Sequence, residues 1–316
     1  MSKWKKYPNF VNTEMLKYRN MGIDLKNFKK ETHELCQTED AFFNIETPRA
    51  VYEKVVRWLP DSTIYIKFLD GDEWQKKWVE KIVKEDIEPI VKNMISLKFV
   101  NKNEYADVKI TFKYEGYGAS LIGTRCRDTA QSDPSMKFGI LDFPKSRMFE
   151  YNGNVYKIPD NIDMSSHSGG AVIKHEFGHV FGKMHEHQNP INNPIQWNVP
   201  KVLKYYSSPP NSWKDSDIYN NIINKLPLSQ VVATPFDPLS IMMYTIDPDL
   251  TTNNIGFQKN DEYSEYDIEW LKNNLLGTRT FLEQYKWYIG VGIIILFIIV
   301  GVVVAYNSTK KSKRKR

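Results

Sequence analysis

The pattern of hydrophobic and polar positions predicts a domain that combines strands and helices. Residues 63–68 read TIYIKF, a run rich in β-forming residues that predicts a strand. Asp72 is a suitable N-cap for a helix that follows this strand. Trp74, Trp78 and Ile82 recur at helical spacing, so this helix is expected to present one apolar face to a core.

The same pattern predicts two more strands and a late helix. Apolar and polar residues alternate over 96–100 and over 107–112, as they do in strands with one buried face. The order strand, helix, strand, strand is typical of an α+β or α/β sheet domain. Ser264, with Asp267 three residues later, predicts a capped helix start, and Gly277 predicts the end of that helix.

The clearest boundary lies near the C-terminus. Residues 287–306 read WYIGVGIIILFIIVGVVVAY, 20 residues without a charge. A helix of this length rises to the ~30 Å of a bilayer core, with aromatic residues at both ends where the membrane interface favours them. The alternative is a buried core helix, but the basic tail 307–316 favours a membrane span. We therefore expect an N-terminal extension, a candidate pro-segment, at 1–48, a domain at 49–280, a transmembrane helix and a basic tail.

Composition excludes several classes of protein. The chain has 316 residues and a formal net charge of +5, and a hydrophobic fraction of 41% excludes a wholly disordered chain. The last ten residues hold six of the basic side chains and no acid, so the rest of the chain carries a net charge of −1. No nucleic-acid partner is expected. Cys36 and Cys126 are the only cysteines, which excludes a small disulfide-stapled fold but leaves one bridge open.

The most informative segment is a cluster of histidines. His175 and His179 are four residues apart, so on a helix they project from one face, where two imidazoles can bind one zinc ion. Glu176 lies between them in sequence and can address a zinc-bound water without being a ligand. The alternative is a pair of surface histidines and a glutamate on an amphipathic helix. Gly182 and His185 follow, and a sharp turn at the glycine would return His185 toward the metal as a third ligand.

This run, HEFGHVFGKMH, is similar to the elongated signature of metzincin proteases. A second match, SIMMY at 240–244, resembles the methionine turn that lies beneath the zinc in that group. With Glu186 directly after the third histidine and Tyr244 two residues after Met242, the chain most resembles the astacin family and its microbial or viral relatives. It departs from the family at Met243, where a histidine usually stands.

The resemblance covers about 49–276 and implies a metzincin-type zincin fold. This fold is α+β, with a twisted mixed sheet, an active-site helix and a mostly irregular C-terminal subdomain. The resemblance implies that His175, His179 and His185 hold one catalytic Zn²⁺ and that Glu176 is the general base. Secreted astacins carry paired disulfides that two cysteines cannot reproduce, which suits a reducing compartment or a cysteine-poor branch.

Other roles implied by the resemblance each have a plainer alternative. Tyr244 would be an additional zinc ligand and oxyanion donor, or a buried aromatic residue. Met242 would be the hydrophobic floor of the site. Glu186 would accept the mature N-terminus, or form an ordinary salt bridge. Residues 116–122 would form the edge strand that pairs with an extended substrate. Independently of the family, Cys36 is a candidate latency ligand for the zinc, although it lacks the flanking residues of a cysteine switch.

The sequence thus predicts a membrane-anchored zinc metalloendopeptidase that cleaves protein or peptide substrates and contacts lipid through 287–306. One alternative is a catalytically inactive membrane-anchored binding or structural protein on a metalloprotease scaffold. A zinc hydrolase with a different type of substrate is the other. The intact set of three histidines and Glu176 favours the enzyme over the inactive scaffold.

Signals for membrane sidedness point in two directions. The basic tail favours a cytoplasmic C-terminus, which would place the domain on the outer or luminal face. Against this, the first residues lack a signal-peptide pattern, cysteines are few, and no Asn-x-Ser/Thr site precedes the span. We therefore expect a single-pass, tail-anchored protein with a cytosolic catalytic domain, on an internal or virion membrane.

Overall fold

A mixed α/β domain is seen in the computed structural model, which describes residues 37–38 and 56–276 except 140, 142, 145, 163, 165–168 and 210. The predicted span 287–306, the tail 307–316, Cys36 and Gly277 lie outside the described residues, as does nearly all of the extension 1–48. No described helix is both long and apolar enough to cross a bilayer.

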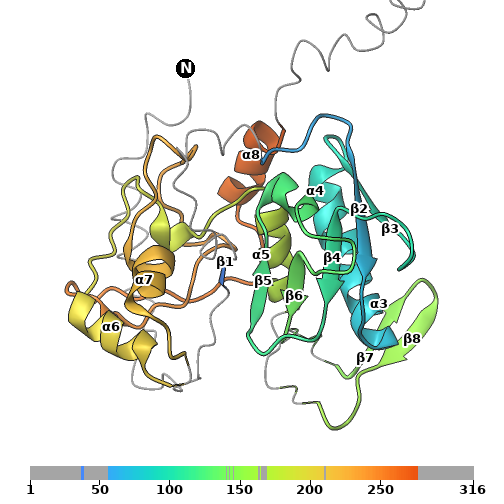
Figure 1. Ribbon diagram of the computed structural model, residues 1–316, viewed down its shortest axis with the longest axis horizontal. Helices are drawn as coiled ribbons and strands as arrows, with labels where there is room; N and C mark the ends of the chain where they lie inside the picture. Colours follow the sequence, from blue (N-terminus) through green and yellow to red (C-terminus); the bar gives the residue numbers. More distant parts are fainter. Residues whose placement is uncertain are drawn as a thin grey trace, which may run out of the picture. The chain divides into compact units, whose positions relative to one another are not determined.

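A six-stranded mixed sheet forms the main layer, in the order β1-β5-β6-β4-β2-β3 (Figure 1). Only β5 and β6 pair antiparallel; all other neighbours are parallel. A separate hairpin joins β7 to β8. The strands are β1 (Gln37–Thr38), β2 (Thr63–Phe68), β3 (Ser96–Phe99), β4 (Val108–Thr111), β5 (Gly118–Ser120), β6 (Met136–Phe138), β7 (Met148–Tyr151) and β8 (Asn154–Lys157).

Most helices are short, and those after α5 are joined by long irregular segments. The α-helices are α3 (Glu73–Ile82), α4 (Glu88–Val91), α5 (Ala171–Val180), α6 (Val199–Ser207), α7 (Asp215–Ile218) and α8 (Glu265–Asn274). Two π-helical turns, η5 (Val83–Ile87) and η8 (Tyr219–Ile223), continue α3 and α7. The 3₁₀ turns are η6 (Gly123–Arg127), η7 (Glu186–Gln188) and η9 (Pro248–Leu250).

The sequence predictions for these elements are confirmed. Strands occur at 63–68, 96–99 and 108–111, within one residue of the predicted bounds. Asp72 is the N-cap of α3, and its backbone N–H donates to the side chain of Gln75 at 2.8 Å. Ser264 caps α8 through a reciprocal capping box with Asp267. Local propensity and capping therefore suffice to place these elements.

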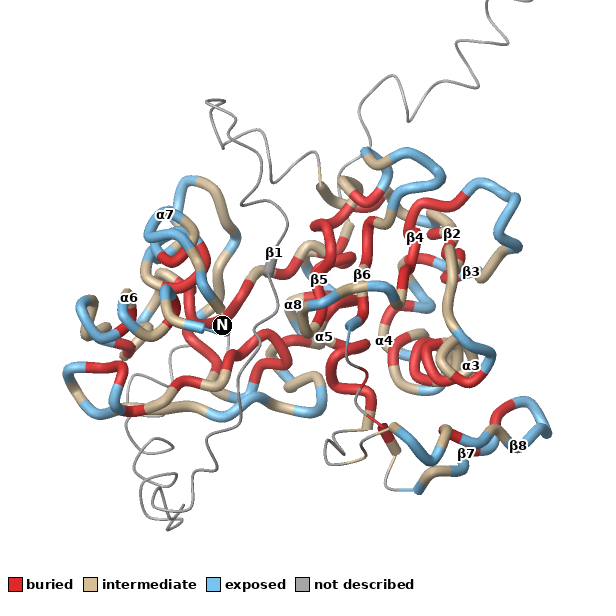
Figure 2. Tube along the Cα trace, turned by 60° about the horizontal axis from the view of Figure 1, so that its bottom comes forward, coloured by how far each residue is buried: buried red, intermediate tan, exposed pale blue. Residues whose placement is uncertain are grey.

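Two larger apolar cores form the interior of the described domain, and a small cluster of Ala171, Ile241 and Met242 joins α5 to the methionine turn. The larger core packs one face of the sheet against α3 and α5, and it includes Ile66, Ile110 and Phe177, all 0% exposed. The smaller core lies among α6, α7 and the loops around them. Buried segments gather along β4, β5 and β6, whereas the hairpin β7–β8 is largely exposed (Figure 2). The helix α5 is thus held between the sheet and the irregular C-terminal part of the domain.

One long-range hydrogen bond fixes the end of α5. The indole Nε1 of Trp58 donates to the carbonyl oxygen of Val180 at 2.7 Å, and Trp58 is 0% exposed. Val180 is the last residue of α5, so its carbonyl has no partner within the helix. The first described residues of the domain therefore anchor the helix that carries the histidine motif.

Candidate metal centre

The helix α5 presents two of the three histidines and ends in a tight turn. His175 and His179 lie one turn apart, with their ring centroids 5.0 Å apart. Gly182 has a φ of +90°, the left-handed region that a side chain disfavours. Its N–H donates to His179 O at 2.8 Å, and the N–H of Lys183 donates to Gly178 O at 2.9 Å. This pair of bonds is the Schellman motif, which closes the helix and turns the chain.

The turn brings His185 back to the helix. The candidate ligand atoms of His175, His179 and His185 all lie within 4.8 Å of one another. The Nε2 atoms of His179 and His185 are 3.1 Å apart. Two nitrogens bound to one tetrahedral zinc at about 2.0–2.1 Å would lie about 3.3 Å apart. The three side chains therefore lie close enough together to bind one metal ion, and the spacing of His179 and His185 is near that expected for zinc.

Backbone carbonyls orient two of these rings. Nδ1 of His175 donates to the carbonyl oxygen of Ile241 at 2.8 Å, and Nδ1 of His179 donates to that of Lys183 at 2.8 Å. An N–H at Nδ1 leaves the lone pair on Nε2, where a metal can bind. The buried Nε2 of His175 has no hydrogen-bond partner among the described residues. A metal ion would satisfy this atom.

Burial keeps the three imidazoles neutral. Desolvation lowers the pKa of His175 to about 4 and that of His179 to about 3. The pKa of His185 is also lowered well below its usual value, first by burial and then by the neighbouring imidazoles. Neutral imidazole is the form that binds zinc, so the site needs no deprotonation near neutral pH.

Glu176 lies directly under the strand β5. The side chain is 0% exposed, and a Cβ built on Gly118 would stand 2.5 Å from its Oε1 and 3.1 Å from a methyl group of Val172. Only a residue without a side chain allows β5 to pass this close to the carboxylate. On its other side β5 pairs with β1, so the predicted edge strand within 116–122 is covered there by residues 37–38.

The predicted methionine turn packs beneath α5. Met242 is 0% exposed, and its sulfur lies 2.4 Å from where a Cβ on Gly178 would stand. The carbonyl oxygen of Ile241 accepts the hydrogen bond from His175, and the carbonyl oxygen of Met242 accepts one from the N–H of Glu186 at 3.0 Å. The turn therefore joins the histidine helix to the segment of the third histidine.

Tyr244 lies among the imidazoles. Its ring centroid is 4.2 Å from that of His185, 4.5 Å from that of His187 and 6.2 Å from that of His175. The residue is 5% exposed. His187 is held in turn by a hydrogen bond from its Nε2 to Asn221 O at 2.8 Å. Tyr244 is thus a buried aromatic residue that lies beside the histidine cluster.

Glu186 is buried and hydrogen-bonded. Its Oε1 accepts from the N–H of Asp237 at 2.8 Å and from Nδ2 of Asn189 at 2.7 Å. Desolvation raises the pKa of its carboxyl to about 8. Within the described part of the chain, Glu186 forms no salt bridge closer than the 4.0 Å usual for an ion pair. The bond from Asp237 ties Glu186 to the segment that precedes the methionine turn.

A buried carboxylate, Asp267, holds the methionine turn in place. Its oxygens accept hydrogen bonds from Oγ of Ser240 at 2.8 Å and from the N–H of Ile241 at 2.7 Å. Nζ of Lys183 lies 2.7 Å from the same carboxylate. The capping pattern predicts Asp267 only as part of a helix start. Its partners in the methionine turn and at Lys183 lie 26 to 84 positions away in sequence. Its link to the metal centre cannot be read from local spacing.

Replacing His185 should remove the metal site without unfolding the domain. In His185→Ala the third imidazole is lost, and zinc affinity is expected to fall by about 100-fold or more, as measured by zinc content after dialysis. Glu269→Ala, an exposed change on α8, is the control. Equal zinc retention in wild type and His185→Ala would show that the third ligand lies elsewhere.

Removing the Asp267 carboxylate should strongly destabilise the domain. Asp267→Ala leaves the ammonium of Lys183, 9% exposed in its side chain, without its carboxylate and frees the methionine turn. Breaking a buried ion pair costs about 3–5 kcal/mol, measurable by denaturant unfolding. Glu269→Ala, an exposed change on the same helix, should cost within about 0.5 kcal/mol. Similar losses in both variants would rule out the role given to Asp267.

Comparison with known proteins gives structural similarity only. No family model matches the chain, and no curated protein matches it. A solved structure of myroilysin is 25% identical, with 70% of this chain and 95% of that chain covered and a TM-score of 0.57. A crystal structure of myroilysin is 22% identical, with 78% and 92% covered and a TM-score of 0.50. The described domain is therefore a mixed α/β fold similar to that of myroilysin, a metalloprotease, and it holds three histidines at metal-binding distance.

Proposed function

We propose that the chain is a zinc-dependent metalloendopeptidase that hydrolyses peptide bonds in proteins. The observation that carries the proposal is the convergence of three buried imidazoles within 4.8 Å, with the Glu176 carboxylate on the same helix. The similarity to the metalloprotease myroilysin is independent support. A relationship to the astacin family is part of this proposal, and the similarity of HEFGHVFGKMH and SIMMY to the astacin pattern supports it.

Each residue of the cluster has a distinct role in the proposed reaction. His175, His179 and His185 hold zinc, which when bound supplies a Lewis acid that makes water nucleophilic near neutral pH. The Glu176 carboxylate accepts a proton from the attacking water and delivers it to the departing amine. Its burial under β5 limits the positions that this carboxylate can take.

Tyr244 and Met242 complete the proposed site. The phenol of Tyr244 is proposed as an additional zinc ligand and as a donor to the oxyanion that develops on the scissile carbonyl. Its ring centroid lies within 4.5 Å of those of both His185 and His187, which would limit its freedom. Met242 is proposed as an apolar floor, because its side chain is fully buried and its sulfur packs against Gly178 of α5.

A peptide substrate is proposed to bind as an extended strand along β5. This strand lies over Glu176, and its outer edge can offer main-chain hydrogen bonds to a peptide. Residues 37–38 pair with Ala119 and Ser120 at that edge. We therefore propose that 1–48 is a pro-segment that has to leave the edge before a substrate can bind there.

The chain is also proposed to be membrane-anchored through 287–306, with the catalytic domain on the cytosolic side. The support for the anchor is the uncharged run with the basic tail behind it. The cytosolic side is proposed against the charge preference of that tail, because cysteines are few and no Asn-x-Ser/Thr site precedes the span. The anchor is independent of the catalytic proposal, because the two rest on different segments.

Glu176→Gln should abolish proteolysis and leave zinc bound. The amide keeps the shape of the side chain but cannot accept the proton, so cleavage of an unfolded protein substrate should fall by about 100-fold or more. Zinc content should equal that of wild type, and Glu269→Gln on the exposed face of α8 should be fully active. Activity within about tenfold of wild type in Glu176→Gln would exclude Glu176 as the base.

Gly118→Ala should displace the carboxylate of Glu176, because Gly118 lies on the strand β5 that packs against it. The added methyl group has to displace Oε1 of Glu176, 2.5 Å away, while the three histidines are untouched. We expect kcat to fall by at least about tenfold, with zinc content and thermal unfolding close to wild type. A variant with full turnover would show that the position of the Glu176 carboxylate is not set by β5.

Protease protection should reveal the side of the membrane on which the domain lies. In intact membranes that carry the full chain, residues 1–280 are expected to be degraded by added protease without detergent, because a tail-anchored protein leaves its N-terminal domain in the cytosol. A lumenal marker protein is the control for membrane integrity. Survival of residues 1–280 until detergent is added would reverse the proposed topology.

A further inference from the structure

The face of the sheet turned away from α3 and α5 is lined by lysines. Along β2, β4 and β6, the residues that alternate with core positions include Lys67, Lys109 and Lys137. Lys67 and Lys109 are register partners on neighbouring strands. A face that carries polar side chains is ordinary when it is solvated, but Lys67 is only 3% exposed and Lys109 is 0% exposed.

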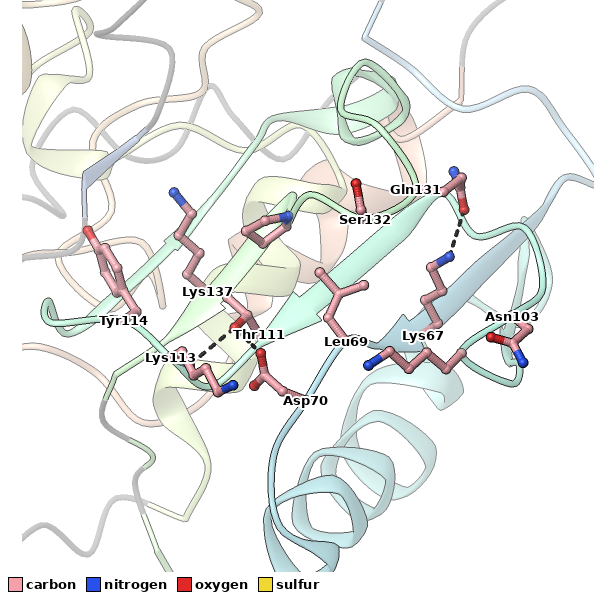
Figure 3. A pocket seen from close by; sticks show the side chains of 12 residues that line it. Lys67, Leu69, Asp70, Asn103, Thr111, Lys113, Tyr114, Gln131, Ser132 and Lys137 are labelled. Carbon is pink, nitrogen blue, oxygen red and sulfur yellow. Dashed lines mark hydrogen bonds between the residues drawn. The ribbon is translucent and has the colours of Figure 1, made fainter.

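A cavity of about 870 Å³ opens on this face (Figure 3). Four lysines line it: Lys67, Lys102, Lys113 and Lys137. Among the described residues that line it, the single acid is Asp70. Both of its oxygens are engaged, by Oγ1 of Thr111 at 2.6 Å and by the N–H of Phe112 at 2.8 Å. The cavity therefore holds a strong excess of positive charge.

The buried ammonium of Lys67 is the main reason to expect an anionic ligand in this positively charged cavity. Its Nζ donates to the carbonyl oxygen of Glu104 and to Oε1 of Gln131, both at 3.0 Å, and the latter bond is drawn in Figure 3. Neither acceptor is charged, and Lys67 forms no ion pair with an acid in the described part of the chain. A buried cation is costly unless an anion compensates it. The cavity that this side chain lines is where an anion can do so.

The other lining groups suit phosphate. Lys102 and Lys113 are exposed and can move toward a ligand, and Lys137 lies over the ring of Tyr114, 5.6 Å from its centroid. Lysine binds phosphate as a point charge, and each phosphate offers several acceptor oxygens to more than one ammonium. The volume is in the range of small-molecule sites and is larger than one phosphate requires.

We propose that this cavity binds a soluble ligand that carries two or more phosphate groups, on the face of the sheet opposite the metal centre. The recess of Lys67 favours a small ligand over a flat membrane surface, because this side chain lines the cavity and is only 3% exposed. The site does not use any residue of the histidine cluster, so the proposal is independent of the proposed proteolysis.

Calorimetric titration of the full chain in detergent tests this proposal. The probes are fructose 1,6-bisphosphate, inorganic phosphate and a tetraglutamate peptide. The bisphosphate is expected to bind saturably and about tenfold or more tighter than either other probe, because its two phosphates reach separate lysines. Tighter binding of tetraglutamate, or the absence of saturable bisphosphate binding up to about 10 mM, would overturn the assignment.

Paired charge reversals locate the binding. Lys102→Glu with Lys113→Glu should weaken bisphosphate binding by about tenfold or more, because both residues line the cavity. Lys92→Glu with Lys201→Glu makes the same change in net charge at exposed lysines outside it, and the effect should stay below about twofold. All four side chains are exposed, so the fold should tolerate both pairs. If both pairs weakened bisphosphate binding equally, the effect would come from the net charge of the chain. That result would contradict the proposed site.

Discussion

The geometry of the metal centre depends on the buried carboxylate of Asp267. This side chain caps α8, accepts a hydrogen bond from the N–H of Ile241 and forms an ion pair with the ammonium of Lys183. Ile241 in turn orients His175 through its carbonyl oxygen, and the carbonyl oxygen of Lys183 orients His179. One carboxylate thus contacts both segments whose carbonyls aim the two helical histidines. Because the pair is buried, it is less screened by water than a surface pair would be.

The second constraint is the burial of the histidines themselves. Packing against α5, the methionine turn and Tyr244 removes water and lowers the pKa of each imidazole, so the cluster is neutral at physiological pH. Without a metal ion this cluster contributes little to the stability of the fold, because the buried Nε2 of His175 has no hydrogen-bond partner in the described residues. Binding of a metal ion would satisfy that atom and stabilise the folded chain by mass action.

Local patterns predict the parts of the structure that depend on neighbours in sequence. The spacing of His175 and His179, the turn at Gly182 and the capping pair Ser264 and Asp267 are all of this kind, and each is found. The close approach of Gly118 to Glu176 and the lysine-lined cavity are different, because they arise from how strands pair and stack. Alternation places Lys67 on the face away from the core, but no local rule predicts that loop residues such as Gln131 cover it.

The most direct test of the proposed zinc peptidase is a zinc titration of the metal-stripped full chain, followed by cleavage of an unfolded generic protein. The account predicts that the metal-free chain is inactive. Activity should rise in proportion to bound zinc, level off at about one ion per chain, and disappear when a chelator removes the metal. Cleavage that persists in the metal-free chain, or one tightly bound zinc ion with no cleavage of any protein offered, would contradict it.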